Sequence, residues 1–203
     1  MNIAIYGGAF DPVTLAHEAI ARIVEGCSFV DQLWIVPCMD HPFGKQMASF
    51  NDRVSMCKSR FGFPMMETRY SRTIDLIDKF KCIFPGNEYL VVIGSDEAGQ
   101  IHKWHRWEEL VEKYKFIVIE RRPECSLTPV EIKYWSKFHH YLTPDPAVPS
   151  TASSSVRKIF NEWWTKEGVQ DGQNQGYDKF ADQISRPIFD LVVAKGLYKP
   201  STP

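Results

Sequence analysis

Near its N-terminus the chain reads Gly7-Gly8-Ala9-Phe10-Asp11-Pro12-Val13-Thr14-Leu15-Ala16-His17, a stretch that joins two apolar patterns. The run Ile3-Ala4-Ile5-Tyr6 precedes it and predicts a buried strand, whereas residues 16–24 are apolar at helical spacing. Paired glycines let the backbone approach a phosphate and present N–H groups to it. Thr14 and His17 face the same side of the predicted helix. A bare Gly-Gly turn would indicate only a tight connection, but the full spacing Gly-x-Phe-x-Pro-x-Thr-x-x-His favours an anion site.

The same alternation of patterns continues along the chain. Short apolar runs recur at residues 33–36, 89–93 and 116–119, with a weaker one at 141–142, and helical patterns separate them. Strands that are apolar on both faces are typical of a parallel sheet covered by helices on both sides. The sequence therefore predicts an α/β fold with a doubly wound, Rossmann-like parallel sheet, in which ligands bind at the carboxyl ends of the strands.

The C-terminal third has a different character. Ser153-Ser154-Ser155 precedes apolar residues at helical spacing from Val156 to Trp163, which predicts a helix capped by hydroxyl groups. Residues 165–178 are polar and rich in Gly and Gln, and predict a flexible surface loop. A last helix is expected between Pro187 and Gly196. We expect one domain over residues 1–203, with a helical C-terminal part over about 153–198.

Composition excludes several classes of protein. The 203 residues carry 24 basic and 25 acidic side chains, so a general basic surface for nucleic acid is not expected. No apolar run approaches the roughly 20 residues of a membrane span, and the N-terminus lacks the regions of a cleaved signal. The five cysteines are scattered and form no CxxC pair, which argues against structural zinc and for a reducing compartment. We expect a cytoplasmic protein, with a homo-oligomer left open.

Three further motifs follow the first in order. Val92-Ile93-Gly94-Ser95-Asp96 precedes Trp104, the strand Ile117-Val118-Ile119 precedes Glu120-Arg121-Arg122-Pro123, and Thr151-Ala152-Ser153-Ser154-Ser155-Val156-Arg157 comes last. With the first motif, which is of the [HT]xGH type, these resemble the nicotinate/nicotinamide mononucleotide adenylyltransferases of the nucleotidyltransferase superfamily. The bacterial members usually carry His where Thr14 stands and Gly where Ala16 stands. The resemblance implies transfer of the adenylyl group of ATP to nicotinate or nicotinamide mononucleotide, with Mg²⁺ bound through the ATP phosphates.

The resemblance also implies roles for individual residues. The attacking phosphate is mostly ionised at neutral pH, because its second pKa is about 6, so no strong general base is needed. Alignment and charge neutralisation remain for the protein to supply. The expected catalytic residues are His17, Arg157 and Thr14. ATP is expected to contact Gly7, Gly8, Ala9, Phe10, Asp96, Ser153 and Ser154. The mononucleotide is expected to contact Trp104, Lys45, Thr73, Arg121 and Arg122.

Each role has a plainer alternative. The serines and Asp96 are also good helix caps, Arg157 is also a solvated charge, and Trp104 is also a core residue. Another nucleotidyltransferase, of phosphopantetheine or cytidylyl type, would share the first motif but is not expected to carry Trp104 and Arg121-Arg122-Pro123 together. A catalytically silent nucleotide-binding protein is the third possibility. The absence of GxGxxG after the first strand disfavours a redox enzyme. The choice between acid and amide, and the roles of His102, His105, His139 and His140, stay open.

Overall fold

A computed structural model describes residues 1–40, 44, 46–68, 71–121, 127–144, 146–166 and 176–200. Its centre is a five-stranded sheet in the order β2-β1-β3-β4-β5, with every neighbouring pair parallel. The strands are β1 (Asn2–Gly8), β2 (Gln32–Pro37), β3 (Glu88–Gly94), β4 (Lys115–Ile119) and β5 (His140–Leu142). All five apolar runs form strands, which confirms the predicted parallel sheet.

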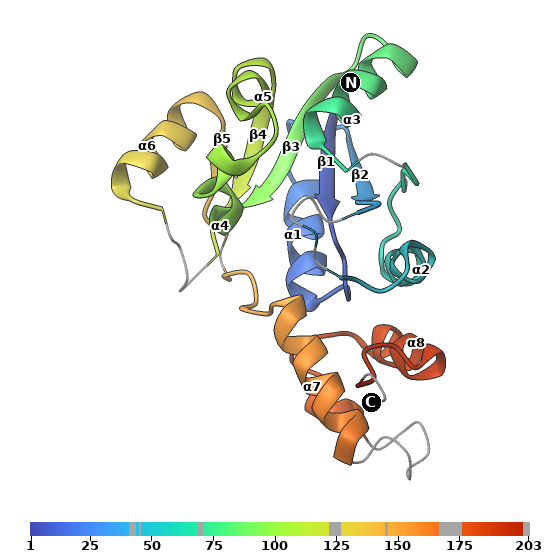
Figure 1. Cartoon of the computed structure of the whole chain (residues 1–203). Helices are drawn as coiled ribbons and strands as arrows, with labels where there is room; N and C mark the ends of the chain where they lie inside the picture. The colour runs from blue at the N-terminus through green and yellow to red at the C-terminus, as the bar shows by residue number, and fades with distance from the viewer. Residues whose placement is uncertain are drawn as a thin grey trace.

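Helices cover both faces of this sheet (Figure 1). Ala4 and Tyr6 of β1 pack into a core with α1 (Leu15–Glu25) and α2 (Phe50–Arg60). Ile3 and Ile5 point the other way, into a core with α3 (Thr73–Ile83), α5 (Trp107–Lys113) and α6 (Pro129–Phe138). Because alternate residues of one strand enter different cores, the strands must be apolar on both faces. The doubly wound arrangement is confirmed.

The order of the strands places a crevice beside β1. The chain passes from β1 to β2 on one side and later returns to β3 on the other, so β1 lies at the topological switch point. Gly7 and Gly8 are the last residues of β1 and pair with Val36 and Pro37. After β3 come the short α4 (Ser95–Ala98) and η1 (Ile101–Lys103). Ligands of open α/β sheets bind at this point, outside the carboxyl ends of the strands.

The C-terminal helices add to the hydrophobic core that lies between the sheet and α1. They are α7 (Ser153–Lys166), η2 (Tyr177–Lys179) and α8 (Arg186–Lys195). Their buried residues, such as Phe160 and Phe189, belong to the same cluster as Ala4 and Ile20. Figure 1 shows α7 and α8 together below the sheet. The buried side chains of α7 and α8 therefore share one hydrophobic core with one face of the sheet.

Two details of this region differ from the sequence-based expectation. The serines were expected to cap α7 from outside, but Ser153 begins the helix and its hydroxyl donates to the Pro12 carbonyl instead, at 2.9 Å. The flexible loop predicted over 165–178 is wrong at both ends. Thr165 and Lys166 continue α7, and Tyr177 begins η2 and packs edge-on against Phe189. Residues 167–175 lie outside the described residues. As predicted, Pro187 lies in the first turn of α8 and Gly196 ends it, with φ of 61°.

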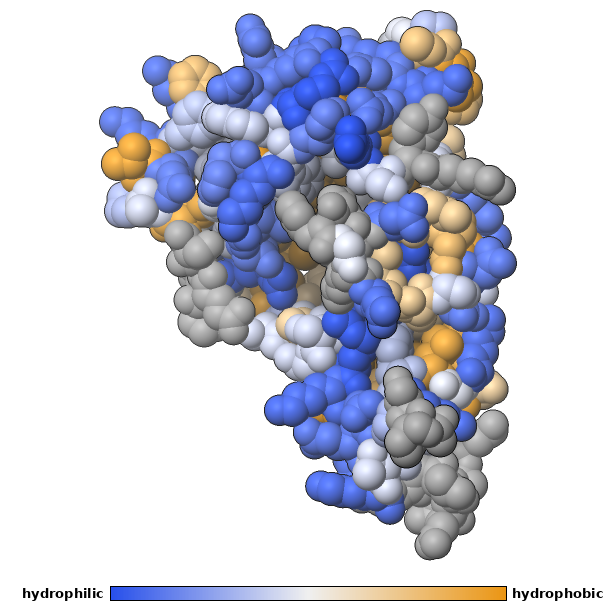
Figure 2. Space-filling view, viewed as in Figure 1, coloured by the Kyte–Doolittle hydropathy of each residue, from blue (hydrophilic) through white to orange (hydrophobic). Residues whose placement is uncertain are grey.

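The surface is largely polar. Hydrophilic residues cover most of the face seen in Figure 2, and one of its small apolar patches lies over α6. There Val130, Tyr134 and Phe138 are exposed at intervals of four residues, so they share one side of the helix. Across the described ranges, no helix combines the length and apolar character needed to cross a membrane.

Candidate functional site

Two cavities adjoin at the carboxyl ends of β1 and β3. The larger, of about 500 Å³, opens toward α3 and η1, and we call it the tryptophan cavity because Trp104 lines it. The smaller, of about 300 Å³, lies between α1 and the start of α7, and we call it the histidine cavity because His17 lines it. Both linings include Gly7, Gly8, Ala9 and Glu97. The two spaces therefore meet at the glycine turn that the sequence singled out.

His17 is held in one orientation and one tautomer. Thr14 is the N-cap of α1, and its backbone N–H donates to Nδ1 of His17 at 2.9 Å. Because Nδ1 accepts, the ring proton must sit on Nε2, which is then a donor. Burial, and then the positive charge of Arg121, lower the pKa of His17 to about 4. At neutral pH the histidine cavity is therefore lined by an uncharged imidazole whose Nε2–H is available for hydrogen bonding.

Thr14 and Phe10 support the imidazole from behind. Thr14 is fully buried, and its hydroxyl lies 3.0 Å from Nδ1 of His17. The buried ring of Phe10 meets the His17 ring edge-on, with centroids 5.1 Å apart. A Cβ on Gly8 would come within 3.1 Å of that phenyl ring, so glycine is required there for close packing. Neither Thr14 nor Phe10 is among the described residues that line the histidine cavity.

The histidine cavity also gathers residues from three distant motifs. Asp96, Arg121, Ser153 and Ser154 all line it. Oδ2 of Asp96 accepts from Nη1 of Arg121 at 3.0 Å, whereas its buried Oδ1 has no partner among the described residues. A Cβ on Gly94 would lie 2.3 Å from that Oδ1, so any other residue there would force the Asp96 carboxylate out of this position. An orphaned carboxylate oxygen here is an acceptor suited to a ligand hydroxyl.

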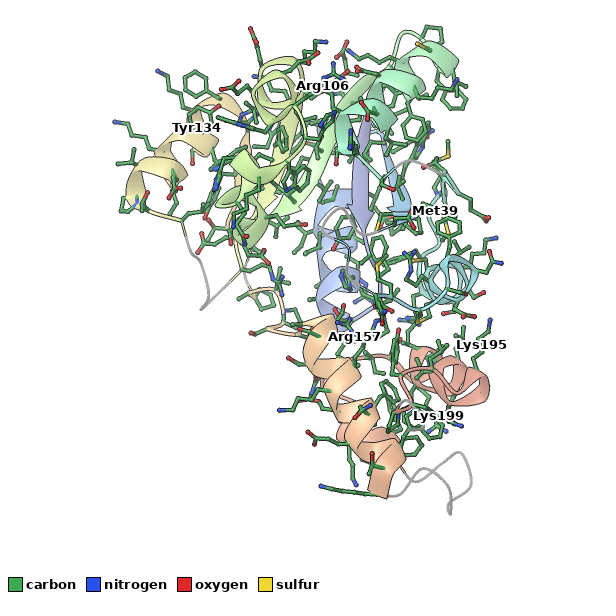
Figure 3. The ribbon with its side chains drawn as sticks, in the orientation of Figure 1. Met39, Arg106, Tyr134, Arg157, Lys195 and Lys199 are labelled. Atoms are coloured by element: carbon green, nitrogen blue, oxygen red, sulfur yellow. The ribbon has the colours of Figure 1, made fainter. Side chains whose placement is uncertain are left out.

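Arg157 lies at the border of the site and not in its lining. Its guanidinium donates to the carbonyl of Asp11 and lies 3.3 Å from Oδ2 of the same residue. Asp11 is fully buried and also accepts from the hydroxyl of Tyr198 at 2.9 Å. Figure 3 shows Arg157 where the first turn of α7 meets the rest of the molecule. In this structure Arg157 therefore fastens α7 to the loop before α1.

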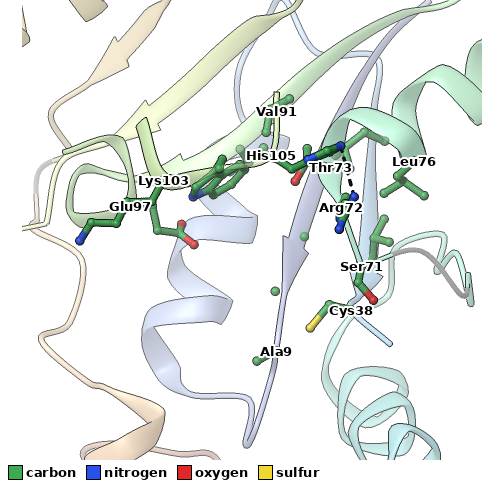
Figure 4. Close-up of a pocket in the computed structure, with 16 residues that line it drawn as sticks. Ala9, Cys38, Ser71, Arg72, Thr73, Leu76, Val91, Glu97, Lys103 and His105 are labelled. Carbon is green, nitrogen blue, oxygen red and sulfur yellow. Dashed lines mark hydrogen bonds between the residues drawn. The ribbon is translucent and has the colours of Figure 1, made fainter. Parts of the chain in front are cut away.

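The tryptophan cavity has an apolar wall and a polar end (Figure 4). Half-buried Trp104 and the first residue of α3, Thr73, both line it. At one end the side chains of Arg72 and His105 contact each other, with Nη1 and Nε2 3.3 Å apart. Figure 4 shows this pair well separated from Glu97. The cavity could thus hold a flat ring against Trp104, with an anionic group toward Arg72 and the N-terminus of α3.

Glu97 lines both cavities, but none of the sequence motifs pointed to it. Its side chain is exposed to the cavities, and its Oε2 accepts from the backbone N–H of Gly94 at 3.1 Å. Desolvation of the carboxyl group by the protein around it, and then the charge of Asp96, raise the pKa of Glu97 to about 7. The available signal was its position three residues after Gly94, which is the spacing of a capping box.

Arg53 was also missed. It is fully buried in α2 and donates to the carbonyls of Ala9, Cys38, Met39 and Ala48, at 2.8–3.1 Å. It therefore fixes the glycine turn against the chain that follows β2. The only signal in the sequence was an arginine at an otherwise apolar position of a helix.

Lys45 and Arg122, predicted to contact the mononucleotide, lie outside the described residues. Within the described part of the chain, no group of three or more His, Cys, Asp or Glu side chains is arranged to hold a metal. His102, in the middle of η1, acquires no assigned role from this arrangement.

The motifs, the fold and the two cavities agree with comparison to known families. A sequence model of the cytidylyltransferase-like family matches residues 5–159, from β1 into the first half of α7. The chain belongs to the cytidylyltransferase-like family. The predicted membership in the nucleotidyltransferase superfamily is thereby confirmed, and the matched range includes all four motifs.

Individual members of the family resemble the chain over most of its length. A probable nicotinate-nucleotide adenylyltransferase of Endomicrobium trichonymphae is 25% identical over 210 residues, covering 98% of this chain and 99% of the relative. One of Caldicellulosiruptor bescii is 29% identical, covering 80% and 88%. The solved structure of Plasmodium falciparum nicotinic acid mononucleotide adenylyltransferase, complexed with NaAD, aligns with a TM-score of 0.76 at 26% identity, covering 97% of both chains.

Proposed function

We propose that this chain transfers the adenylyl group of ATP to nicotinate mononucleotide, giving the dinucleotide NaAD and pyrophosphate. The observation that carries the proposal is the pair of cavities that meet at Gly7, Gly8 and Ala9. A reaction between two nucleotides needs two such spaces, with the reacting phosphates at their junction. The named activity of relatives that match nearly the whole chain supports the same reaction.

ATP occupies the histidine cavity in this proposal. The free Oδ1 of Asp96 accepts a hydroxyl of the adenosine ribose, which gives a specific form to the ATP contact expected for Asp96. Ser153 and Ser154 begin α7, a helix whose unpaired N–H groups and positive dipole end favour phosphate. Arg157, expected to be catalytic, is one turn further along α7. It would contact the β- and γ-phosphates in this proposal, and to do so it must leave Asp11.

The chemistry consists of alignment and charge neutralisation. An oxygen of the mononucleotide phosphate attacks the α-phosphorus of ATP, a new P–O–P bond forms, and pyrophosphate leaves. The attacking phosphate is already mostly ionised, so no residue has to take a proton from it. Nε2–H of His17 donates to an α-phosphate oxygen, where negative charge builds up in the transition state. Thr14 acts through His17, since it holds the acceptor nitrogen away from the phosphate.

Mg²⁺ enters this proposal with ATP, as part of the substrate. An ion bound to the triphosphate would neutralise charge that the side chains here leave uncompensated, since Arg121 is already paired with Asp96.

The expectation of a cytoplasmic location also stays a prediction. It is supported by Cys27, Cys38, Cys57 and Cys82, all of which are free thiols.

The tryptophan cavity favours the acid over the amide of the pyridine substrate. With the ring against Trp104, the substituent reaches Arg72, His105 and the first N–H groups of α3. Arg72 can donate to either group, but only the carboxylate also forms an ion pair with the guanidinium and can accept two parallel hydrogen bonds from it. Among the described residues, the side chain of Arg72 has no acidic partner to compete for its charge.

The decisive assay offers ATP and Mg²⁺ with nicotinate or nicotinamide mononucleotide, side by side. We expect a dinucleotide from the acid with much the larger kcat/KM. If neither mononucleotide yields a dinucleotide, the proposed function is wrong, and the chain is a binding protein or a transferase for another acceptor.

Arg72→Gln tests the basis of that selectivity. We expect kcat/KM for the acid to fall about tenfold, because the ion pair between the guanidinium and the carboxylate is lost at a partly exposed site. The amide should change little. Lys79→Gln is the matched control, since it removes a positive charge from the exposed side of the same helix. If the ratio of kcat/KM for the acid to kcat/KM for the amide is unchanged in Arg72→Gln, Arg72 does not determine the selectivity, and backbone groups alone must do so.

A further inference from the structure

Among the residues that the structure describes, one ionisable side chain lines both cavities at their junction. Of the residues common to both linings, Gly7, Gly8 and Ala9 offer only backbone groups, and Glu97 alone can carry charge. If the proposed function holds, the mononucleotide phosphate must meet the α-phosphate of ATP at this junction. A carboxyl group therefore stands where two polyanions are brought together.

Glu97 is fixed there by its own helix. Its Oε2 accepts from the backbone N–H of Gly94, which anchors one oxygen to the start of α4. Glu97 lines both cavities, and its other oxygen, Oε1, has no hydrogen-bond partner among the described residues. An ionised carboxylate in that position would repel both substrates, and the repulsion would grow as they displace the cavity water.

The charged groups around Glu97 do not cancel this repulsion. Asp96 is its neighbour on α4 and adds a second negative charge. Arg121, after β4, is the positive group whose charge lowers the pKa of Glu97, but Oδ2 of Asp96 accepts its hydrogen bond at 3.0 Å. Lys103 of η1 lines only the tryptophan cavity, and its exposed ammonium donates to Oε1 of Gln100 at 3.0 Å and forms no ion pair with Glu97. His17 on α1 is uncharged at neutral pH, since burial lowers its pKa to about 4.

The remaining titratable groups around the cavities lie on other elements. Tyr6 of β1 is buried, and burial raises the pKa of its phenol well above the ordinary value. Cys38, beyond β2, has a raised pKa for the same reason. Arg72 and His105 contact each other at the far end of the tryptophan cavity. Glu97 is thus left as the group whose proton most directly changes the charge at the junction.

We propose that Glu97 is a neutral acid when both nucleotides are bound, and that Oε1–H donates a hydrogen bond to a phosphate oxygen at the junction. Glu97 is then a phosphate-binding residue, and ionisation converts it from a donor into a repelling charge. Its raised pKa, about 7 without nucleotides, means that much of the free protein already holds the required proton near neutrality. Bound phosphates would raise that pKa further.

The test compares pH profiles of kcat/KM for nicotinate mononucleotide between pH 6 and 9. In the unchanged protein, kcat/KM should fall about tenfold for each pH unit above the pKa of Glu97. Glu97→Gln keeps an acceptor for Gly94 and a permanent donor, so its profile should be nearly flat above pH 7. Glu112→Gln removes an equal charge from the exposed side of α5 and should keep the falling limb.

Two results would overturn the proposal. One is a Glu97→Gln profile that falls in parallel with the unchanged protein. The other is a Glu97→Gln variant with a normal melting curve that loses activity equally at every pH, because that result would require an ionised carboxylate.

A binding measurement separates this proposal from the proposed function. Calorimetric titration with nicotinate mononucleotide and a non-hydrolysable ATP analogue at pH 8, in buffers of different ionisation enthalpy, reports proton uptake. We expect more uptake by the unchanged protein than by Glu97→Gln, even if no dinucleotide forms with ATP. Equal uptake, or binding of neither nucleotide, would overturn the role of Glu97. A missing dinucleotide with normal proton uptake would overturn only the proposed reaction.

Discussion

At the scale of the residue, His17 decides how the histidine cavity receives phosphate. Its acceptor nitrogen is occupied by the Thr14 N–H, so only Nε2–H faces the ligand. We expect His17→Ala to lower kcat about 10²–10³-fold, since a donor to charge developing in the transition state is lost. Thr14→Val keeps the backbone N–H that holds His17 and should lower kcat far less than His17→Ala does. A near-normal rate in His17→Ala, measured with saturating ATP and mononucleotide, would remove His17 from the mechanism.

Trp104 is the second residue whose role is open to a simple test. Its ring lines the larger cavity and is only half-buried, unlike the core tryptophan Trp135. We expect Trp104→Ala to raise KM for the mononucleotide about tenfold or more, as for loss of a stacked base, with KM for ATP nearly unchanged. Similar increases for both substrates would instead indicate a packing role.

The sequence revealed residues with fixed local geometry and missed those defined by distant neighbours. Gly8, His17 and Asp96 were recognised because turn, helix start and strand end lie within one short motif each. Arg157 was recognised as a functional residue, but its partner Asp11 lies 146 positions away in the chain, so the contact was invisible. Glu97 and Arg72 gain their interest only from the cavities around them.

At the scale of the element, periodicity predicted every strand of the sheet. Strands that alternate between two cores are apolar throughout, and this signal is local. The end of α7 was missed because polar residues such as Thr165 and Lys166 tolerate both helix and loop, so composition alone does not choose between them. Packing of Gly176 against Trp163 is a tertiary contact that no local pattern contains.

The attachment of α7 to the glycine turn gives a prediction at this scale. Arg157→Ala leaves the buried carboxylate of Asp11 with its hydrogen bonds from Tyr198 and Ala48 but without its ion pair. We expect the free energy of unfolding to fall by roughly 1–3 kcal/mol, and kcat/KM for ATP to fall with it. Arg157→Lys should recover part of the stability. An unchanged urea midpoint in Arg157→Ala would show that this contact does not hold α7 in place.

At the scale of the whole molecule, buried histidines make stability depend on pH. His139 packs against Phe116 and Trp135, and both ring nitrogens are buried without partners among the described residues. Burial, and then the charge of Lys115, lower its pKa to about 4. The folded state therefore binds this proton less readily than the unfolded state, and the contribution to stability present above pH 6.5 is lost as pH falls toward 4.

His139→Phe should weaken that dependence. A phenyl ring fits the same aromatic surroundings, leaves no unpaired nitrogen and takes up no proton, so we expect a gain of about 1 kcal/mol at pH 7 and a larger gain at pH 5. Thermal melting at both pH values measures this. His17 and His140, whose pKa values are also lowered, still titrate in the variant and keep some acid sensitivity. An equal loss of melting temperature between pH 7 and 5 in both proteins would exclude His139 as a cause.

A crystal structure with NaAD bound tests the central claim most directly, because one ligand must occupy both cavities at once. We predict its pyridine ring against Trp104, its adenosine ribose at Asp96, and its two phosphates beside Gly7–Ala9, with Nε2 of His17 about 3 Å from a phosphate oxygen. A dinucleotide whose phosphates lie away from the glycine turn, or whose pyridine ring lies outside the tryptophan cavity, would contradict the account.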